Sequence, residues 1–324
     1  MNLQRIWQWL WERLSGQAPA PAITEKIPEQ SGGLPPIASV PVPELDEEQD
    51  YQSILLYKLD DLLNLSRSKK DTMTLKILRD MVAKEELELP RMPALAMQLM
   101  ALDIDGPEDS YQIAMLIKQD RDVTARVMEA ANSFVFGSQP ARTLEHAIVR
   151  LGLTTVQQIA VGASTHAVIY RIPGYDTEAA ALGILAQDAA LTCQQLARVC
   201  RQEPGAAFLS GLFHDVGKVL VLRILSQVRA RTRGGRASVL LVRRLNRQLH
   251  VPLGAWFAQA RGLPISVQEA ISFHHEPIDG LSGLVWAVQT LQEDPDLEGV
   301  EWNDLAPPPE AVRTALQKRR DQAA

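Results

Sequence analysis

The histidines of this chain gather in a few short motifs that could hold a metal ion. His214 and Asp215 are adjacent in FHDVGK, His250 stands in HVPLG, and His274 and His275 are adjacent in ISFHHEP. Imidazole nitrogens and carboxylate oxygens bind divalent metals, and a bound metal can activate water against a phosphoester. The clustering therefore indicates a metal centre. Histidines that pack between helices with their hydrogen bonds satisfied would give the same pattern, so this alternative stays open.

The sequence around these motifs predicts helices throughout. FLSGLFHDVGKVLVL is predicted as one apolar helix that carries His214 and Asp215. If His274 and His275 also lie on a helix, their side chains point about 100° apart, so one can face the site while the other faces elsewhere. Dense helical periodicity runs from Pro90 to about Leu291, and no alternating strand pattern appears. We therefore expect an all-α fold.

Glycine and proline divide this helical region. Breaks are predicted near Gly106-Pro107, Gly137 to Pro140, Gly152, Pro173-Gly174, Pro204-Gly205, Gly234-Gly235, Gly262 to Pro264 and Pro277 to Gly280.

A longer series of motifs resembles one known family. The series begins with LPRMPALAMQLM and continues through IAMLIKQDRDVTARVMEAANSFVFG, in which Asp120, Asn132, Ser133 and Gly137 stand at characteristic places. AIVRLGLTTVQQIAV, HDVGK, HVPLG, Leu263-Pro264 and ISFHHEP follow in order. Together they resemble the HDOD family of bacterial output domains, within the HD superfamily of metal-dependent phosphohydrolases, over about two hundred residues. The resemblance implies a multi-helix bundle of two packed subregions and a role in signal transduction.

The resemblance also assigns roles to the candidate site residues. His214 and Asp215 match the central metal ligands of the active relatives. His250 and either His274 or His275 match later ligands. Lys218 matches a lysine near the phosphate in the related cyclic-dinucleotide phosphodiesterases.

Two positions depart from the ligand pattern that the resemblance implies. An earlier ligand histidine is expected in ILAQDAALTCQQLA, where Gln187 stands, although a shift of one residue would bring in Asp188. A closing aspartate is expected in LVWAVQTLQ, which has no acid before Glu293. A neutral amide binds divalent metal far more weakly than imidazole or carboxylate. We therefore expect no cofactor, or a weakly held divalent metal, in a non-catalytic regulatory module that binds protein partners. A residual metal-dependent phosphohydrolase or cyclic-dinucleotide phosphodiesterase is the alternative.

The domain organisation follows from composition and pattern. We expect a Trp-rich amphipathic helix over residues 1–16, a disordered Pro-rich linker over 17–45 and a helical pair over 46–88. The HDOD-like domain would span 89–291, in two subregions that meet near Ile172 to Gly174, and a polar tail would follow over 292–324.

The first helix carries Trp7 and Trp11 within an apolar stripe, and Trp9 near its polar side. The stripe could dock on this protein's own core or on a partner, or it could lie in a membrane interface, where tryptophan is favoured. A membrane-tethered adaptor is thus a third functional hypothesis.

No apolar run approaches the roughly 20 residues that span a bilayer. The two cysteines, Cys193 and Cys200, are too far apart on one helix for a disulfide. We expect a cytoplasmic protein, with peripheral contact at the inner membrane as the alternative.

A basic stretch stands out in a chain of net charge −6. No Asp or Glu occurs between Asp215 and Glu269, whereas ten Lys and Arg do, among them Arg229, Arg231, Arg233 and Arg236 around a Gly-Gly turn. Guanidinium groups suit bidentate contacts to phosphate and carboxylate, so this stretch could bind an acidic partner, a nucleotide or RNA. The alternative is that it pairs with acids elsewhere in the chain, such as those of ELDEEQD or DPDLEGVEWND. The overall negative charge gives no strong case for DNA.

Overall fold

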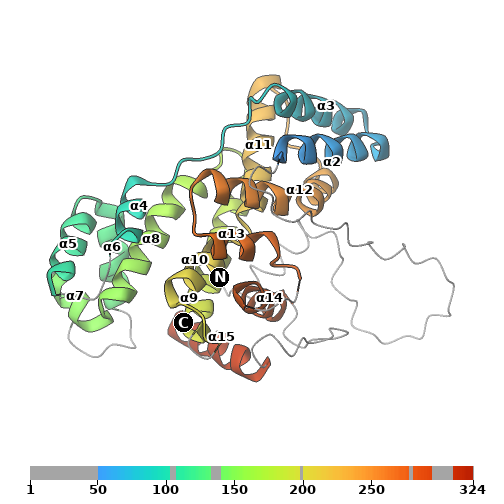
Figure 1. Cartoon of the computed structure of the whole chain (residues 1–324). Coiled ribbons are helices and arrows are strands. Elements are labelled where there is room, and N and C mark those ends of the chain that lie inside the picture. Colours follow the sequence, from blue (N-terminus) through green and yellow to red (C-terminus); the bar gives the residue numbers. More distant parts are fainter. Residues whose placement is uncertain are drawn as a thin grey trace, which may run out of the picture.

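The computed structural model describes residues 50–102, 107–132, 140–197, 200–276, 280–293 and 309–323. All regular secondary structure within these ranges is helical, which confirms the all-α prediction (Figure 1). The predicted Trp-rich helix and Pro-rich linker lie outside the described residues, as do Ser133, Gly137 and residues 294–308. Among the described helices, none has the length and apolar character needed to cross a bilayer.

The first lobe of the fold forms one end of the molecule in Figure 1. Two residues of the family pattern stabilise it. The carboxylate of Asp120 accepts hydrogen bonds from the backbone N–H groups of Asp122 and Val123 and so caps a helix. The amide of Asn132 bonds both the N–H and the C=O of Ala141, at 2.6 and 3.1 Å. The lobe consists of α4 (Ala94–Met100), α5 (Pro107–Lys118), α6 (Arg121–Ala131), α7 (Leu144–Leu151) and α8 (Leu153–Ile169).

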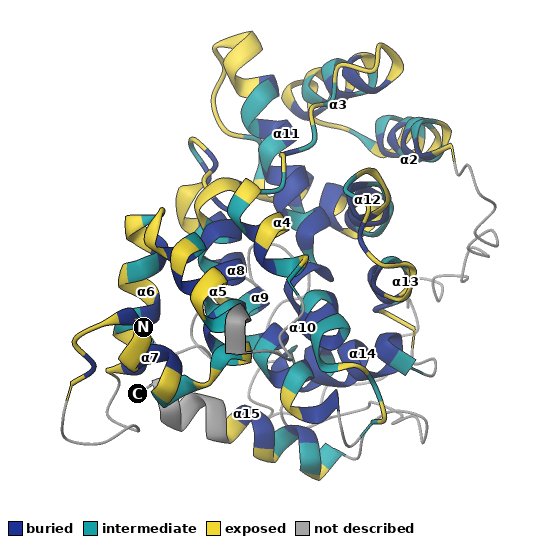
Figure 2. Ribbon diagram, turned by 60° about the vertical axis from the view of Figure 1, so that its left-hand side comes forward, coloured by how far each residue is buried: buried dark blue, intermediate teal, exposed yellow. Residues whose placement is uncertain are grey.

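The second lobe contains the histidine motifs. Many residues of its helices are buried (dark blue in Figure 2), and their apolar side chains belong to the main hydrophobic core or to a second, smaller cluster that includes the last two helices. The lobe consists of α9 (Asp176–Ala197), α10 (Pro204–Phe213), α11 (Val216–Thr232), α12 (Val239–Ala260), α13 (Ile265–Ser272), α14 (Gly280–Glu293) and α15 (Pro309–Ala323).

The predicted helical pair forms a hairpin of α2 (Tyr51–Leu65) and α3 (Lys69–Ala83) that packs on α11 and α12. Its apolar face is buried, and polar contacts join it to the turn between α11 and α12. Ser238 Oγ donates to the Asp71 carboxylate at 2.7 Å, and Lys70 Nζ donates to the Arg236 carbonyl at 2.8 Å. The hairpin is therefore an integral part of the second lobe's surface.

Several predicted helix breaks are confirmed at glycines whose backbone has positive φ. Gly152 separates α7 from α8 with φ of 81°, Gly174 precedes α9 with φ of 83°, and Gly262 separates α12 from α13 with φ of 62°. Residues with a Cβ rarely adopt this conformation, so glycine sets where these helices turn.

Two local predictions are wrong, and both affect the site. FLSGLFHDVGKVLVL is not one helix, because α10 ends at Phe213 and α11 begins at Val216, so His214 and Asp215 form the turn between them. Likewise His274 and His275 do not lie on a helix but in the turn that follows α13. Apolar periodicity continues across the first turn and hides it, whereas the second turn comes two residues before the break predicted at Pro277 to Gly280.

Candidate functional site

The turn at His214 and Asp215 is brought against α12 by a close helix contact. Gly217, at the start of α11, lies so near the backbone of His250 that a Cβ on it would overlap the His250 carbonyl. Gly254, one turn further along α12, lies on the same side of the contact. The absence of side chains at these positions lets α11 and α12 approach closely. The His-Asp turn and His250 therefore face one site.

Three of the histidines are oriented in the same way. Nδ1 of His214, His250 and His274 lies 2.9, 2.5 and 2.7 Å from the carbonyl oxygen of a residue three or four positions earlier. A carbonyl only accepts, so each Nδ1 carries the proton and each neutral ring presents the lone pair of Nε2 to the site. Metal-binding histidines are usually held by such a second contact.

The histidines of α12 and of the turn after α13 converge. His250 Nε2 lies 2.7 Å from His275 Nε2, and the ring centroids of His274 and His275 are 4.1 Å apart. One ligand atom from each of these three side chains lies within 4.8 Å of the others. Both histidines of the pair therefore contribute to the cluster, which a turn allows because it does not impose helical spacing on them. His275 is exposed, whereas His250 and His274 are buried.

Asp215 is the anionic centre of the site. Its Oδ2 lies 2.7 Å from Lys218 Nζ and 3.5 Å from His214 Nε2. Its Oδ1 lies 3.6 Å from His274 Nε2, and both of these buried atoms lack a hydrogen-bond partner. When His274 is protonated on Nδ1, both atoms are acceptors, so the space between them suits a cation or a proton.

Burial and charge set the protonation states. Burial lowers the pKa of His214 to about 4 and that of His250 to about 3. These rings are thus neutral at pH 7, the form that binds metal. Burial opposes ionisation of Asp215, but Lys218 and then His214 hold the pKa of its carboxyl well below the usual range.

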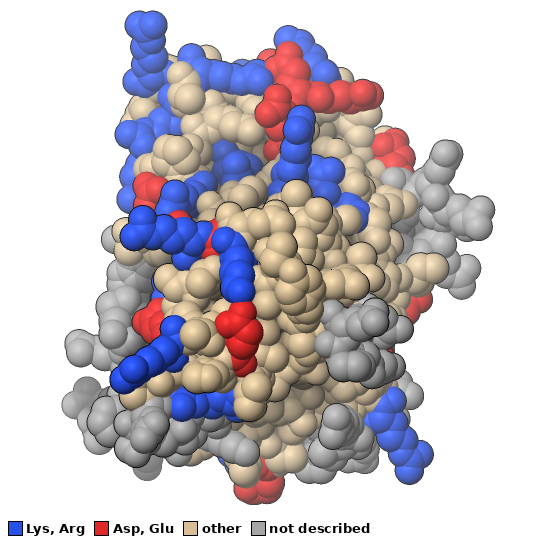
Figure 3. All heavy atoms as spheres, turned by 90° about the vertical axis from the view of Figure 1, so that its left-hand side faces the viewer, with Lys and Arg blue, Asp and Glu red and all other residues tan. Residues whose placement is uncertain are grey.

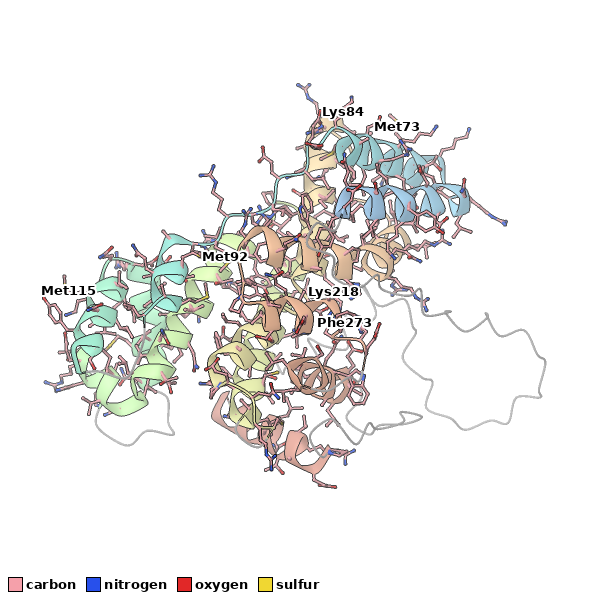
Figure 4. The ribbon with its side chains drawn as sticks, viewed as in Figure 1. Met73, Lys84, Met92, Met115, Lys218 and Phe273 are labelled. Atoms are coloured by element: carbon pink, nitrogen blue, oxygen red, sulfur yellow. The ribbon has the colours of Figure 1, made fainter. Side chains whose placement is uncertain are left out.

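Lys218 stays charged for a related reason. Burial lowers the pKa of its ammonium, but the charges of Asp215 and Glu293 outweigh that effect and raise the pKa above its ordinary value. Figure 4 shows Lys218 in the same part of the second lobe as Phe273, the residue before His274.

The expected earlier ligand on α9 is replaced by an amide that packs on another helix. Gln187 lies against α8, with its Oε1 in the space that a Cβ on Gly162 would fill. Asp188, the neighbouring candidate, accepts a hydrogen bond from Gln292 Nε2 of α14 at 2.9 Å.

The expected closing acid is represented by Glu293, at the end of α14. Gln289 Nε2 donates to its carboxylate at 2.8 Å, and burial raises the pKa of its carboxyl. The charge of Glu293 also helps to raise the pKa of the Lys218 ammonium.

The motifs of the His-Asp turn, of α12 and of the His-His turn also occur within a region that matches a known sequence family. The model of the HDOD domain matches residues 89–277. The chain belongs to the HDOD family. The resemblance seen in the sequence is thereby confirmed, and the site lies almost wholly within the matched HDOD domain, with Glu293 beyond it. Among curated proteins, none matches the chain.

Solved structures share the fold. A candidate phosphohydrolase from Shewanella amazonensis SB2B is 20% identical with a TM-score of 0.52, over 76% of this chain and 94% of that one. A candidate signal transduction protein from Marinobacter aquaeolei VT8 is 17% identical with a TM-score of 0.53, over 86% of this chain and 66% of that one. A candidate metal-dependent phosphohydrolase from S. amazonensis SB2B is 18% identical with a TM-score of 0.50, over 80% of this chain and 99% of that one. At these identities the likeness shows the fold alone.

The basic stretch of the HDOD domain makes many contacts within the molecule. Arg231 pairs with Glu86, which follows α3. Arg236 pairs with the buried Glu178 of α9, and its guanidinium lies 4.6 Å from the centre of the Tyr175 ring.

Other arginines of the stretch bind backbone. Arg223 donates to the carbonyls of residues 168 and 169, and Arg261 to those of residues 89 and 90. The guanidinium of Arg229 lies over Gly174, and Arg233 is exposed with φ of 48° at the end of α11. Figure 3 shows Lys and Arg side chains mixed with Asp and Glu over the upper part of one face, at the height where Figure 1 places α3 and α11. Binding of an acidic partner by Arg229, Arg231, Arg233 and Arg236 stays a prediction.

Sequence reasoning missed two features of the site. The first is Gly217, whose signal was a glycine two residues after Asp215 in an otherwise apolar helix. The second is the pairing of Lys218 with Asp215, because the resemblance assigned the lysine to phosphate. Their spacing of three residues at the start of α11 was a signal for this pair.

Proposed function

We propose that this HDOD protein is a non-catalytic regulatory module of signal transduction, which acts by binding protein partners and carries a degenerate metal site. The observation that carries the proposal is the 2.7 Å contact between Lys218 Nζ and Asp215 Oδ2. The carboxylate that would bind a metal is already neutralised by a cation of the same chain.

The geometry of this ion pair disfavours a catalytic metal centre. A divalent ion bound to His214 Nε2 and Asp215 Oδ2 would have to displace the ammonium group, since Lys218 and His214 approach the same oxygen. Two cations close together at a partly buried site repel strongly. Gln187 supports the proposal, because its side chain packs on Gly162 where a metal ligand is expected.

The remaining donors still fit one divalent ion. His250, His274 and His275 would hold it, with Oδ1 of Asp215 as the anionic ligand, and the unpartnered Asp215 Oδ1 and His274 Nε2 are the atoms that such an ion would satisfy. Such an ion, when bound, supplies Lewis-acid polarisation of a phosphate oxygen or of water. The chain's own contribution would be to orient His250 and His274 through their Nδ1 contacts and to keep the ring of His250 neutral.

The second candidate function is a residual metal-dependent phosphohydrolase or cyclic-dinucleotide phosphodiesterase. The observation that favours it is the convergence of the three histidines, whose ligand atoms lie within 4.8 Å of one another. In this alternative Lys218 would leave Asp215 and contact a phosphate instead.

Metal content and turnover measured on the same preparation distinguish the two candidates. The purified full chain is analysed for bound metal and then assayed with manganese against phosphodiesters, including cyclic dinucleotides, beside the His214→Ala variant. The proposal predicts turnover no greater than that of the variant. Stoichiometric metal with turnover that the substitution abolishes would instead establish the hydrolase.

A further inference from the structure

The turn that joins α2 to α3 lies beside the first turns of α12. Arg244 of α12 donates a hydrogen bond to the Leu65 carbonyl, at the end of α2, over 3.5 Å. At the start of α3, the Asp71 carboxylate accepts a hydrogen bond from Ser238, the residue that caps α12. The end of the hairpin and the start of α12 are far apart in the sequence, but they therefore form one surface.

Large aliphatic side chains are exposed on this surface. Leu65 is 64% exposed, and Val239 and Leu240, in the first turn of α12, are 50% and 54% exposed. A single exposed leucine is ordinary in a soluble domain. Several that gather in one place, with polar residues around them, are typical of a surface that contacts another molecule or a membrane.

Basic side chains accompany these aliphatic ones. Leu240, Arg244 and Arg247 follow one another at spacings of four and three residues, so they lie along one exposed face of α12. The turn between α2 and α3 adds Arg67 and Lys69, which are also exposed. Within the described part of the chain, these Lys and Arg side chains form no ion pair. The hairpin-end surface consists of Leu65, Arg67, Lys69, Val239, Leu240, Arg244 and Arg247.

Acidic residues are scarce around the hairpin-end surface. No Asp or Glu occurs over residues 62–70 or 216–268, although the whole chain has a net charge of −6. Asp71, which follows the first of these ranges, is buried. Asp61, one turn before Leu65, is exposed. Positive charge is thus segregated at the end of the hairpin, which favours contact with an anionic surface.

We propose that the hairpin-end surface docks on membranes that contain anionic phospholipids. Its aliphatic side chains enter the headgroup region, and the long Lys and Arg side chains around them reach the lipid phosphates. Exposed aliphatic side chains favour lipid over single-stranded nucleic acid, which binds through aromatic rings on which bases stack. The hairpin-end surface contains no aromatic residue. This inference goes beyond the proposed function, because it gives the regulatory module a membrane surface on which to act.

Sedimentation of the full chain with vesicles tests the docking. Vesicles of phosphatidylcholine and phosphatidylserine in equal parts are compared with vesicles of phosphatidylcholine alone. We expect more protein to sediment with the anionic vesicles, and the difference to shrink at high salt because salt screens the attraction. Equal sedimentation with the two kinds of vesicle, or none with either, would overturn the proposal.

A variant without the cations assigns the binding to this surface. It replaces the Lys and Arg of the hairpin-end surface by glutamine: Arg67, Lys69, Arg244 and Arg247. Each cation near an anionic membrane strengthens binding by about fivefold, so we expect the partition coefficient on anionic vesicles to fall by about tenfold or more. The control variant makes the same change of net charge at exposed positions elsewhere: Lys84, Arg91, Arg121 and Arg142. It should bind as the parent does, and equal binding by the two variants would refute the assignment.

A fluorescent label shows whether the aliphatic side chains enter the lipid. Leu240→Cys is labelled with a polarity-sensitive fluorophore in a Cys200→Ser background, in which the remaining native thiol, Cys193, is buried. We expect the emission to shift to the blue when anionic vesicles are added. A label at Val149→Cys, on the exposed side of α7, should keep its emission. A shift at both positions or at neither would contradict the proposed orientation.

Nucleic acid is the competing ligand for a basic surface. Single-stranded RNA, added in place of vesicles, should leave the emission of the label at residue 240 unchanged. Binding of RNA that the cation variant loses, together with no preference for anionic vesicles, would overturn the proposal and assign the surface to nucleic acid. These measurements do not depend on metal or turnover at the His site, which the metal analysis and the phosphodiesterase assay decide.

Discussion

Lys218 Nζ lies 2.7 Å from Asp215 Oδ2, the same oxygen that His214 Nε2 approaches to 3.5 Å. One carboxylate oxygen thus faces both a cation of the chain and the imidazole beside which a metal would bind. The other oxygen, Oδ1, faces His274 and lacks a hydrogen-bond partner. The two sides of Asp215 therefore differ: one is neutralised, and the other remains able to accept a cation.

Removing the ammonium of Lys218 should destabilise the fold and strengthen metal binding. In Lys218→Met the carboxylate of Asp215 loses its partner at a site where both side chains are less than a fifth exposed. We expect a loss of roughly 3 kcal/mol in the free energy of unfolding, as for other broken buried pairs. Denaturant titration measures it, with Lys76→Met as the control because Lys76 is exposed.

The same variant should bind manganese more tightly by calorimetry, since Oδ2 of Asp215 becomes free for the metal. An unchanged stability together with weaker manganese binding would contradict the role given to this lysine.

Gly217→Ala should separate α11 from α12. A Cβ at this position would overlap the backbone carbonyl of His250, which cannot move without moving the helix. We expect a loss of roughly 3 kcal/mol in the free energy of unfolding, typical of severe overpacking. Gly235→Ala is the matched control, because the nearest atom to its Cβ would be Lys70 Nζ, at an ordinary 3.6 Å. Equal thermal stability of the two variants would refute the close contact.

The metal-free protein should lose stability on mild acidification. The pKa of His250 is lowered by burial to about 3 and that of His214 to about 4, from 6.5 for an unperturbed histidine. Below about pH 6.5 the unfolded chain takes up protons that the folded chain does not, so the free energy of unfolding falls between about pH 6.5 and pH 4 and is level above that range. Urea titrations in EDTA from pH 8 to pH 4.5 measure this slope.

His250→Gln should make the slope shallower, since glutamine does not titrate and only the contribution of His214 remains. The exposed His146 supplies the control, His146→Gln, which should keep the wild-type slope. A wild-type slope in His250→Gln would show that this ring is not buried in its neutral form.

The arginines around the turn between α11 and α12 should differ in how much each contributes to the stability of the fold. Arg236→Ala leaves the buried Glu178 without this ion pair and removes a contact to Tyr175, so we expect a loss of about 2 kcal/mol in stability. Arg233→Ala should lower the free energy of unfolding by less than about 0.5 kcal/mol, because Arg233 is exposed.

Salt-dependent binding of an acidic peptide or RNA should weaken when Arg231, Arg233 and Arg236 are all replaced by alanine. No binding in the parent protein would dismiss the predicted anionic partner.

The sequence predicted the helical class and the order of the elements because apolar periodicity and glycine positions are local signals. Gly152, Gly174 and Gly262 marked helix ends correctly, since each needs a backbone conformation that other residues avoid. The turn at His214-Asp215 was missed because apolar residues continue on both sides of it, and the turn at His274-His275 begins shortly before the break predicted at Pro277 to Gly280. Their conformation depends on contacts with α12 that are far away in the sequence.

The candidate site was predicted as a set of residues but not as an arrangement. The motifs identified His214, Asp215, Lys218, His250, His274 and His275, and the structure brings all six together. The ion pair of Lys218 with Asp215 could not be predicted from the sequence, because it depends on where the Lys218 Nζ lies in the folded chain. The packing of Gln187 on Gly162 could not be predicted either, because it depends on how α8 and α9 contact each other in three dimensions.

Crystals soaked in manganese, with anomalous scattering used to locate the ions, test the central claim most directly. The account predicts at most one manganese ion, held by His250, His274, His275 and Oδ1 of Asp215, with the Lys218 ammonium still on Oδ2. A fully occupied pair of ions bridged by Asp215, with Lys218 displaced and Gln187 or Asp188 completing the coordination, would contradict it.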